Sequence, residues 1–568
     1  MKSELLIRIR IISGIVFLVA IILLGRLYFV QIIHGEDFSN DADRQYTNAG
    51  QDLYNRGSIF LNDKDGRLVS GATLRSGFTL AISPKDLKDA EDAYEKISTL
   101  IEIDQDTFFL RAGKKNDPYE EIAKQVDPDT AHAIENLDID GVNIYKDRWR
   151  FYPGENLAAQ TLGFVGFIGD EFAGRYGLER YYNDVLERNS DGMYINFFAE
   201  IFANINSAVF KKGNRSGDVM VSIEPSVQLF LEEKIEEVSE RWNSRQTAGV
   251  IINPQNGEIH ALAVYPNFNV NEFGEEKEAS VFSNPIVESV YEMGSIIKPL
   301  TMVAGVDAGA VTATTTYYDA GKIDLNGYTI SNYDGKSRGR VPMQEVLSQS
   351  LNTGVAFVVG EMGNKRFADY MLSFGVGDET GIDLPNESAG LVDNLDSPRD
   401  LEYATASFGQ GIAMTPISTV RALSVLANGG KLITPHLAKK IKYTSGLSKT
   451  MTFVDERVLK EESVQEVTRM LVKVVDEALL GGAVKLDNYS VAAKTGTAQI
   501  ADLKEGGYYE DKFLHSFFGY FPAYDAQYLV FLYTIEPKEV RYASQTLTHP
   551  FIDTVKFLIN YYEVPPDR

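Results

Sequence analysis

The chain has 568 residues, a formal net charge of −25 and no cysteine. The negative charge opposes binding to nucleic-acid phosphates or anionic lipid through the bulk of the surface. Without cysteine the chain has neither disulfides nor a thiol nucleophile, and its six histidines show no metal-ligand spacing such as His-Glu-x-x-His. We therefore expect no nucleic-acid partner, no metal site and no cofactor.

The first 35 residues have the pattern of a membrane anchor. Lys2, Arg8 and Arg10 precede an uncharged stretch over 11–25, and 27–33 is again mostly apolar. A bilayer requires a helix of about 20 residues, and basic residues before it keep the N-terminus in the cytoplasm. A cleaved signal peptide is the alternative, but no small-residue cleavage site follows. We expect residues 1–35 to form a cytoplasmic tip and a single transmembrane helix, with the rest of the chain outside the cell membrane.

The part of the chain after this segment is long enough for at least two folded domains. The polar, glycine-containing stretch over 211–217 is the candidate joint between them. We place a non-catalytic domain at 36–215 and a second domain at 216–568.

The second domain reads as a mixture of helices and strands. Hydrophobic periodicity predicts a helix at its start, then a hairpin, then further strands and a closing helix. The predicted helices are 226–242 and 547–562, and the predicted strands are 247–253, 258–264, 489–499, 516–521 and 528–535. This order favours an α+β fold, with an antiparallel sheet faced by helices and with a helical lobe.

Three short strings in this domain carry the chemistry, and the first is SIIK at 295–298. Ser295 is the only serine followed three positions later by lysine. The apolar stretch after it predicts a helix, so Ser295 and Lys298 are expected on one face at its N-terminus. A buried lysine can lose its proton near neutral pH and act as general base toward a hydroxyl. The helix N-terminus favours the negative charge that then develops.

The other two strings supply polar and cationic groups. Ser350-Leu351-Asn352 lies in or at the entry of a predicted helical segment over 346–359, where the hydroxyl could relay a proton and the amide could hold a substrate peptide group. The string KTGT at 494–497 continues a predicted strand. The ammonium of Lys494 and the hydroxyls of Thr495 and Thr497 suit a carboxylate, and Gly496 allows a substrate backbone to approach closely.

Strings of these three types, in this order, are the signature of penicillin-binding proteins and serine β-lactamases. The chain resembles class B penicillin-binding proteins, which are monofunctional peptidoglycan D,D-transpeptidases. The resemblance extends to a glycine-rich segment over 408–416 and to a hairpin over 253–266. Upstream, 56–59, 148–154 and 177–179 resemble motifs of the family's elongated, mixed, dimerisation-like pedestal domain. Two departures are Met293, where the family usually has proline, and Ala493, where it usually has glycine.

The resemblance implies an acyl-enzyme mechanism of cell-wall crosslinking for division or elongation. Ser295 would be the nucleophile and Lys298 the base, with Ser350, Asn352 and Lys494 as further catalytic groups. The substrate-binding residues would be Thr495, Gly496 and Thr497. Peptidoglycan stem peptides would be the substrates, β-lactams the inhibitors, and a polytopic SEDS-type glycosyltransferase, with other cell-wall synthesis proteins, the partner. The alternatives are a D,D-carboxypeptidase or β-lactamase, which would pass the acyl group to water, and a non-enzymatic β-lactam sensor or scaffold.

The pedestal motifs also lead to a structural expectation. Glu179, Arg56 and Arg148 lie far apart in the sequence within these motif-like contexts. We expect Glu179 to form an ion pair with Arg56 or Arg148. The burial of Glu179 decides its importance, because an exposed pair contributes about 0 to 1 kcal/mol, whereas breaking a buried one costs roughly 3 to 5.

Overall fold

The computed structural model describes residues 54–168, 171–188, 216–502, 504 and 506–568. The chain divides into two compact units, one comprising residues up to 55 with 74–150 and the other 56–73 with 151–568. The predicted transmembrane helix and most of the predicted joint at 211–217 lie outside the described residues, and the domain boundaries stay predictions. Within the described ranges, no helix combines the length and the apolar character needed to cross a bilayer.

The first unit is a small α+β layer. The second half of β2 (Leu68–Ile82) pairs antiparallel with β3 (Glu120–Val126), with Phe78 opposite Val126. Its helices are α3 (Ala90–Ile97), α4 (Gln105–Ala112) and α5 (Pro128–Glu135). Each helix starts after an aspartate whose side chain accepts hydrogen bonds from first-turn amides, which satisfies donors that lack a helical partner. Buried apolar side chains from sheet and helices form one core, including Leu80, Ile82, Phe108 and Ile134.

The N-terminal part of the second unit is built around a buried ion pair. Arg56 Nε donates to Glu179 Oε2 at 2.6 Å and Nη2 donates to the Glu179 carbonyl at 2.8 Å, while Nη1 donates to Asn183 Oδ1 at 2.9 Å. The two side chains are 2% and 0% exposed. The predicted ion pair of Glu179 is therefore confirmed, with Arg56 as its partner. The surrounding elements are β1 (Ile59–Asn62), α6 (Ala159–Leu162), β5 (Val165–Ile168), β6 (Glu171–Gly174), α7 (Gly177–Tyr181) and α8 (Asn183–Leu186).

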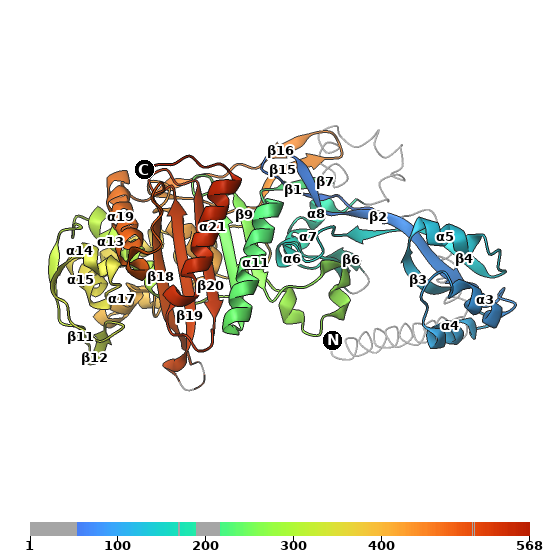
Figure 1. Cartoon of the computed structure of the whole chain (residues 1–568), viewed down its shortest axis with the longest axis horizontal. Helices are drawn as coiled ribbons and strands as arrows, with labels where there is room; N and C mark the ends of the chain where they lie inside the picture. The colour runs from blue at the N-terminus through green and yellow to red at the C-terminus, as the bar shows by residue number, and fades with distance from the viewer. Residues whose placement is uncertain (1–53, 169–170, 189–215, 503, 505) are drawn as a thin grey trace, which may run out of the picture. The chain divides into compact units, whose positions relative to one another are not determined.

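A five-stranded antiparallel sheet in the order β18-β19-β20-β8-β9 forms the centre of the second unit. Its strands are β8 (Gln246–Ile252), β9 (Ile259–Tyr265), β18 (Ala492–Ala501), β19 (Tyr508–Phe521) and β20 (Tyr528–Ile535). Helices α11 (Pro225–Trp242) and α21 (Thr548–Tyr561) cover one face of this sheet (Figure 1). Their apolar side chains and those of the sheet share one core, with Leu231, Phe517 and Phe551 fully buried. The predicted sheet and its two covering helices are confirmed.

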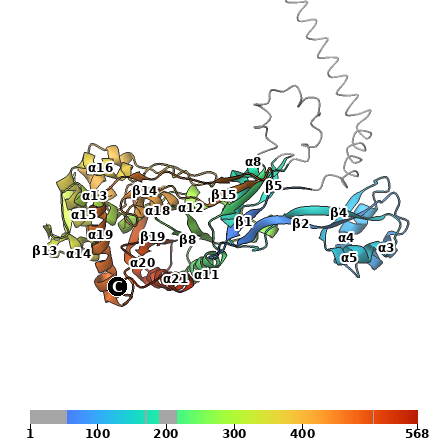
Figure 2. The ribbon, with the colours of Figure 1, turned by 90° about the horizontal axis from the view of Figure 1, so that it is seen from above.

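The other part of the second unit is a helical lobe beside β18. Figure 2 shows α13, α14, α15, α16 and α19 gathered at this end of the sheet. The lobe and its connections comprise α12 (Pro285–Glu288), α13 (Lys298–Asp307), α14 (Met343–Ser348), α15 (Asn352–Met362), α16 (Asn364–Ser373), α17 (Asp400–Ala406), α18 (Pro416–Ser424) and α19 (Glu461–Lys473). Short strand pairs join these helices: β10 (Thr316–Asp319) with β13 (Gly339–Pro342), β11 (Lys322–Leu325) with β12 (Tyr328–Ser331), and β14 (Lys431–Leu432) with β17 (Glu456–Arg457). A further sheet contains β7 (Gly217–Val221), β15 (Ala438–Tyr443) and β16 (Ser448–Thr450).

Candidate active site

Ser295 lies on a single 3-10 turn, η6 (Gly294–Ile297), that leads directly into α13. Pro299 is tolerated there because first-turn amides need no helical acceptor. The turn packs against β18, and Gly294 has a left-handed φ of +66°. A Cβ on Gly294 would lie 3.1 Å from the Thr497 carbonyl oxygen, so the turn is held close to the strand. Ser295 remains half-buried at the start of the helix, where its hydroxyl borders a cavity.

Lys298 follows one turn later and is completely buried. Its Nζ donates to the Ser350 carbonyl at 2.6 Å and to Ser350 Oγ at 3.1 Å. Burial lowers the pKa of Lys298 well below its ordinary value, and the nearby charge of Lys494 lowers it further. A lysine in this position can be neutral near physiological pH, which a general base requires.

Ser350 lies between two helices rather than within one. Helix α14 ends at Ser348 and α15 begins at Asn352, so the helix predicted over 346–359 is interrupted. Ser350 has a left-handed φ of +56°, a conformation that costs energy for a residue with a side chain. Because of this break, both the carbonyl and the hydroxyl of Ser350 accept from Lys298. The side-chain amide of Asn352 donates through Nδ2 to the Ser331 carbonyl at 2.9 Å, and this bond connects α15 to the end of β12.

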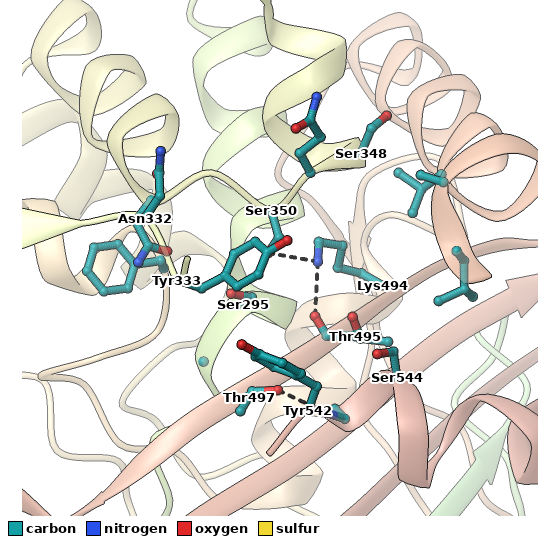
Figure 3. A pocket seen from close by; sticks show the side chains of 18 of the residues that line it. Ser295, Asn332, Tyr333, Ser348, Ser350, Lys494, Thr495, Thr497, Tyr542 and Ser544 are labelled. Carbon is teal, nitrogen blue, oxygen red and sulfur yellow. Dashed lines mark hydrogen bonds between the residues drawn. The ribbon is translucent and has the colours of Figure 1, made fainter. Parts of the chain in front are cut away.

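The third string, KTGT, lies on β18, beside the turn that carries Ser295. Lys494 Nζ donates to Ser350 Oγ and to the Thr495 carbonyl, both at 3.0 Å (Figure 3). Burial lowers the pKa of Lys494 to about 7. Two lysine side chains thus share one serine hydroxyl as acceptor. The Thr497 hydroxyl accepts from the Ala543 amide at 3.0 Å, so its own proton stays available to a ligand.

Gly496 has a packing role that the sequence does not indicate. A Cβ there would lie 2.4 Å from Ser516 Oγ and 2.8 Å from the Met293 carbonyl oxygen. Ser516 Oγ in turn donates to that carbonyl at 2.8 Å. Only glycine lets β18 approach the turn of Ser295 this closely. The expected contact between Gly496 and a substrate backbone stays a prediction.

Polar residues at the ends of β10 and β12 and at the start of α15 form a hydrogen-bond network that sequence reasoning missed. The carboxylate of Asp319 is fully buried and accepts from Asn332 Nδ2 at 2.9 and 3.1 Å and from Thr353 Oγ1 at 2.8 Å. Asn332 Oδ1 accepts from the Thr353 amide at 3.3 Å. This network fixes the first turn of α15, and with it Asn352. A lone Asp or Asn at the end of a short strand has no sequence signal, because its burial depends on elements distant in the chain.

The three strings meet at a cavity of about 570 Å³. Ser295, Ser350, Asn352, Lys494, Thr495 and Thr497 all line it, while Lys298 lies behind Ser350. Among the described lining residues, Lys494 and Arg541 are the charged ones, and none is acidic. Tyr333 and Tyr542 contribute aromatic rings whose centroids are 5.9 Å apart. In a chain with a net charge of −25, this local excess of positive charge favours an anionic ligand.

Comparison with known proteins gives consistent results along the chain. The model of the penicillin-binding protein transpeptidase domain matches residues 247–555, and that of the penicillin-binding protein dimerisation domain matches 53–197. Stage V sporulation protein D of Bacillus subtilis is 28% identical over 566 residues, which cover 97% of this chain and 85% of that protein. The peptidoglycan D,D-transpeptidase FtsI of Buchnera aphidicola is 25% identical over 565 residues, covering 98% and 95%.

Solved structures show the same fold. Penicillin-binding protein 2X of Streptococcus thermophilus superposes with a TM-score of 0.73 at 19% identity, covering 90% of this chain and 81% of that one. Penicillin-binding protein 3 of Mycobacterium tuberculosis, in complex with aztreonam, superposes with a TM-score of 0.69 at 22% identity, covering 91% and 98%.

Proposed function

The chain belongs to the penicillin-binding protein transpeptidases, and on this premise we propose that it crosslinks peptidoglycan through an acyl-enzyme on Ser295. The activity is serine D,D-transpeptidation in cell-wall synthesis for division or elongation. One observation supports the residue assignment above the others. The buried Lys298 and Lys494 both donate to Ser350 Oγ, beside a nucleophile at a helix N-terminus.

In the acylation step, neutral Lys298 takes the proton of Ser295, and the Ser295 oxygen attacks the carbonyl between the two terminal D-alanines of a stem peptide. The backbone N–H groups of Ser295 and Thr497 stabilise the oxyanion. The C–N bond then breaks, and the leaving D-alanine receives its proton from Lys298 directly or through Ser350. The shared hydroxyl of Ser350 suits this relay because both lysines contact it.

In the second step, an amine of a neighbouring stem attacks the ester carbonyl and releases Ser295 with its proton restored. Asn352 orients the donor peptide, and Lys494, Thr495 and Thr497 hold its terminal carboxylate. A β-lactam reproduces the D-alanyl-D-alanine end and stops the reaction at the acyl-enzyme, since its leaving group stays attached to the acyl part.

Intact-protein mass spectrometry tests this proposal. A β-lactam should add once per chain on the peptide that contains Ser295, and Ser295→Ala should take no label while keeping its melting temperature. Labelling on another residue, or none in folded wild type, would contradict the assignment. An adduct that persists for hours after removal of free β-lactam excludes the β-lactamase alternative. Failure of any adduct to form would favour the non-enzymatic scaffold.

We also propose that residues 11–33 anchor the chain in the cell membrane and that the N-terminal domain contacts a SEDS-type glycosyltransferase. The mostly apolar segment, which follows basic residues and is interrupted by Arg26, supports the anchor, and the match of 53–197 to the dimerisation domain supports a domain devoted to architecture or partner contact. Membrane fractionation of the full chain and of a chain lacking residues 1–35 tests the anchor. Co-purification with the glycosyltransferase in detergent tests the partner.

A further inference from the structure

Arg541 is the one permanent cation among the described residues that line the cavity, and no step of the proposed reaction uses it. It is exposed, and its guanidinium lies 5.8 Å from the ring centroid of Tyr542. No carboxylate in the described part of the chain pairs with it. An arginine at the edge of a cavity without acidic residues is positioned for an anion from solution.

The polypeptide around Arg541 is held by contacts of its main chain. His515 Nε2 lies 3.0 Å from the Arg541 carbonyl, which can only accept, so Nε2 carries the proton. Burial lowers the pKa of His515 to about 4, which keeps the imidazole neutral. Two residues later the Ala543 amide donates to Thr497 Oγ1. The guanidinium is therefore presented by a fixed segment, and truncating its side chain leaves these bonds intact.

The same contacts locate Arg541 at one end of the cavity. Thr497 pairs with His515 in the β18–β19 ladder, and the segment from Arg541 to Ala543 is bonded to both residues. Figure 3 shows Tyr542 beside Thr497, at the opposite side of the cavity floor from Ser350. The Thr497 hydroxyl has accepted one hydrogen bond and retains its proton for donation.

Lys494 is less suited to hold a carboxylate by charge alone. Two of its N–H groups are already used, since they donate to Ser350 Oγ and to the Thr495 carbonyl. With a pKa of about 7 it loses its charge in part at physiological pH. Arginine keeps its charge at every accessible pH and binds carboxylates with two parallel N–H groups.

We propose that Arg541, together with the Thr497 hydroxyl, binds the C-terminal carboxylate of the donor stem peptide and so determines specificity for donors with a free terminal carboxylate. The proposal rests on the proposed transpeptidase function. A stem peptide can carry a second carboxylate on its acyl side, and the experiment distinguishes the two sources.

The test uses three N-acyl-D-alanyl thioesters. In the first, the thiol leaving group ends in a carboxylate and the acyl part has none, and in the second the carboxylate of the leaving group is amidated. The third has the amidated leaving group and a carboxylate in the acyl part. Ser295 attacks the thioester carbonyl, the C–S bond breaks and the released thiol is measured. Each rate constant is determined for wild type, Arg541→Ala, Arg541→Lys and Arg366→Ala, the last being an exposed arginine on α16 outside the cavity.

Arg541→Ala should react about 10- to 100-fold more slowly with the first thioester, the range for loss of a charged hydrogen bond, and within twofold of wild type with the second. Arg541→Lys should recover part of the rate, because lysine restores the charge but not the two parallel N–H groups of the guanidinium. Arg366→Ala should match wild type, and the loss in Arg541→Ala should shrink at 1 M salt.

Equal losses on the first two thioesters, or no loss on either, would overturn the proposal. A loss confined to the pair that differs in the acyl part would assign Arg541 to another carboxylate and also overturn it. A melting temperature of Arg541→Ala equal to that of wild type excludes misfolding as the cause. If wild type released no thiol from any thioester, the transpeptidase function itself would fail, which is a different result.

Discussion

The second unit contains two groups of buried charge that are arranged in opposite ways. In the N-terminal part, Arg56 contacts the carboxylate and carbonyl of Glu179 and the amide oxygen of Asn183, so the charge is matched and its donors are used. At the candidate active site, Lys298 and Lys494 make no contact with a carboxylate of the described residues and converge on one neutral hydroxyl. Both groups are fully or almost fully buried.

The two groups of buried charge therefore differ in role: one supports the fold, and the other belongs to the candidate active site. A matched pair compensates the cost of desolvation by Coulomb attraction and hydrogen bonds. At the candidate active site, burial lowers the pKa of both lysines, and the charge of Lys494 lowers the pKa of Lys298 further. The first arrangement stabilises the fold, whereas the second destabilises the protonated state of Lys298, as its proposed role as a base requires. Substitutions in the two groups should therefore change stability in opposite directions.

The largest expected effect is a loss of unfolding free energy in Glu179→Ala. The substitution leaves the guanidinium of Arg56 buried without its counterion, which costs roughly 3 to 5 kcal/mol of unfolding free energy. Denaturant unfolding followed by circular dichroism measures the change. Folded Glu179→Ala should still be acylated at Ser295 by a β-lactam at the wild-type rate, because the pair contributes no residue to the cavity.

An exposed pair on α16 provides the matched control. Lys365 and Asp369 have a 3.2 Å contact, and their side chains are 89% and 61% exposed. Lys365→Ala should change the unfolding free energy by less than about 1 kcal/mol, because solvent screens such pairs. Equal costs for Lys365→Ala and Glu179→Ala would mean that burial is not the source of the effect.

The next largest effect is expected for Lys298→Met, which removes the amine and keeps an unbranched side chain of similar length. Acylation by a β-lactam should slow by at least roughly 10²-fold, the contribution of a general base. The melting temperature should not fall, because no ion pair is broken in the described contacts of Lys298. Stopped-flow or mass-resolved acylation kinetics measure the rate. A rate within threefold of wild type would show that another group accepts the proton of Ser295.

Regular elements with a strong hydrophobic pattern could be predicted closely from the sequence. The strand predicted over 528–535 coincides with β20. The helix predicted over 226–242 begins one residue later than α11, and that predicted over 547–562 is one residue longer than α21 at each end. Each of these elements has a buried face set by its own sequence. The three strings were also local enough to be read directly, and the structure places them around one cavity.

What the sequence could not predict depends on contacts between distant segments. The sequence predicts a helical segment over 346–359, and the structure breaks it at Ser350, which meets two lysines from other elements. The direction of Lys494 Nζ toward Ser350 has the same origin. Arg541 comes from a loop that is positioned by His515, one strand away. In each of these places a tertiary contact overrides or adds to the local pattern.

The smallest expected effect, and the most diagnostic one, concerns the pH dependence of stability in Lys494→Met. The folded-state pKa of about 7 lies below the ordinary value of 10.5, so below pH 7 both folded and unfolded chains hold the proton and the full cost of burying the charge is present. Between pH 7 and 10.5 the folded chain has released this proton while the unfolded chain keeps it, so wild-type stability rises with pH. Replacing a buried ion by an apolar side chain stabilises by roughly 1 to 4 kcal/mol. We expect about 1 kcal/mol at pH 6, because Nζ has two acceptors, and less at pH 9. Urea unfolding of both proteins at the two pH values measures this difference. A loss of stability at pH 6, or a gain that does not change with pH, would show that Lys494 is as well compensated as Arg56 and would remove the distinction between the two charge groups.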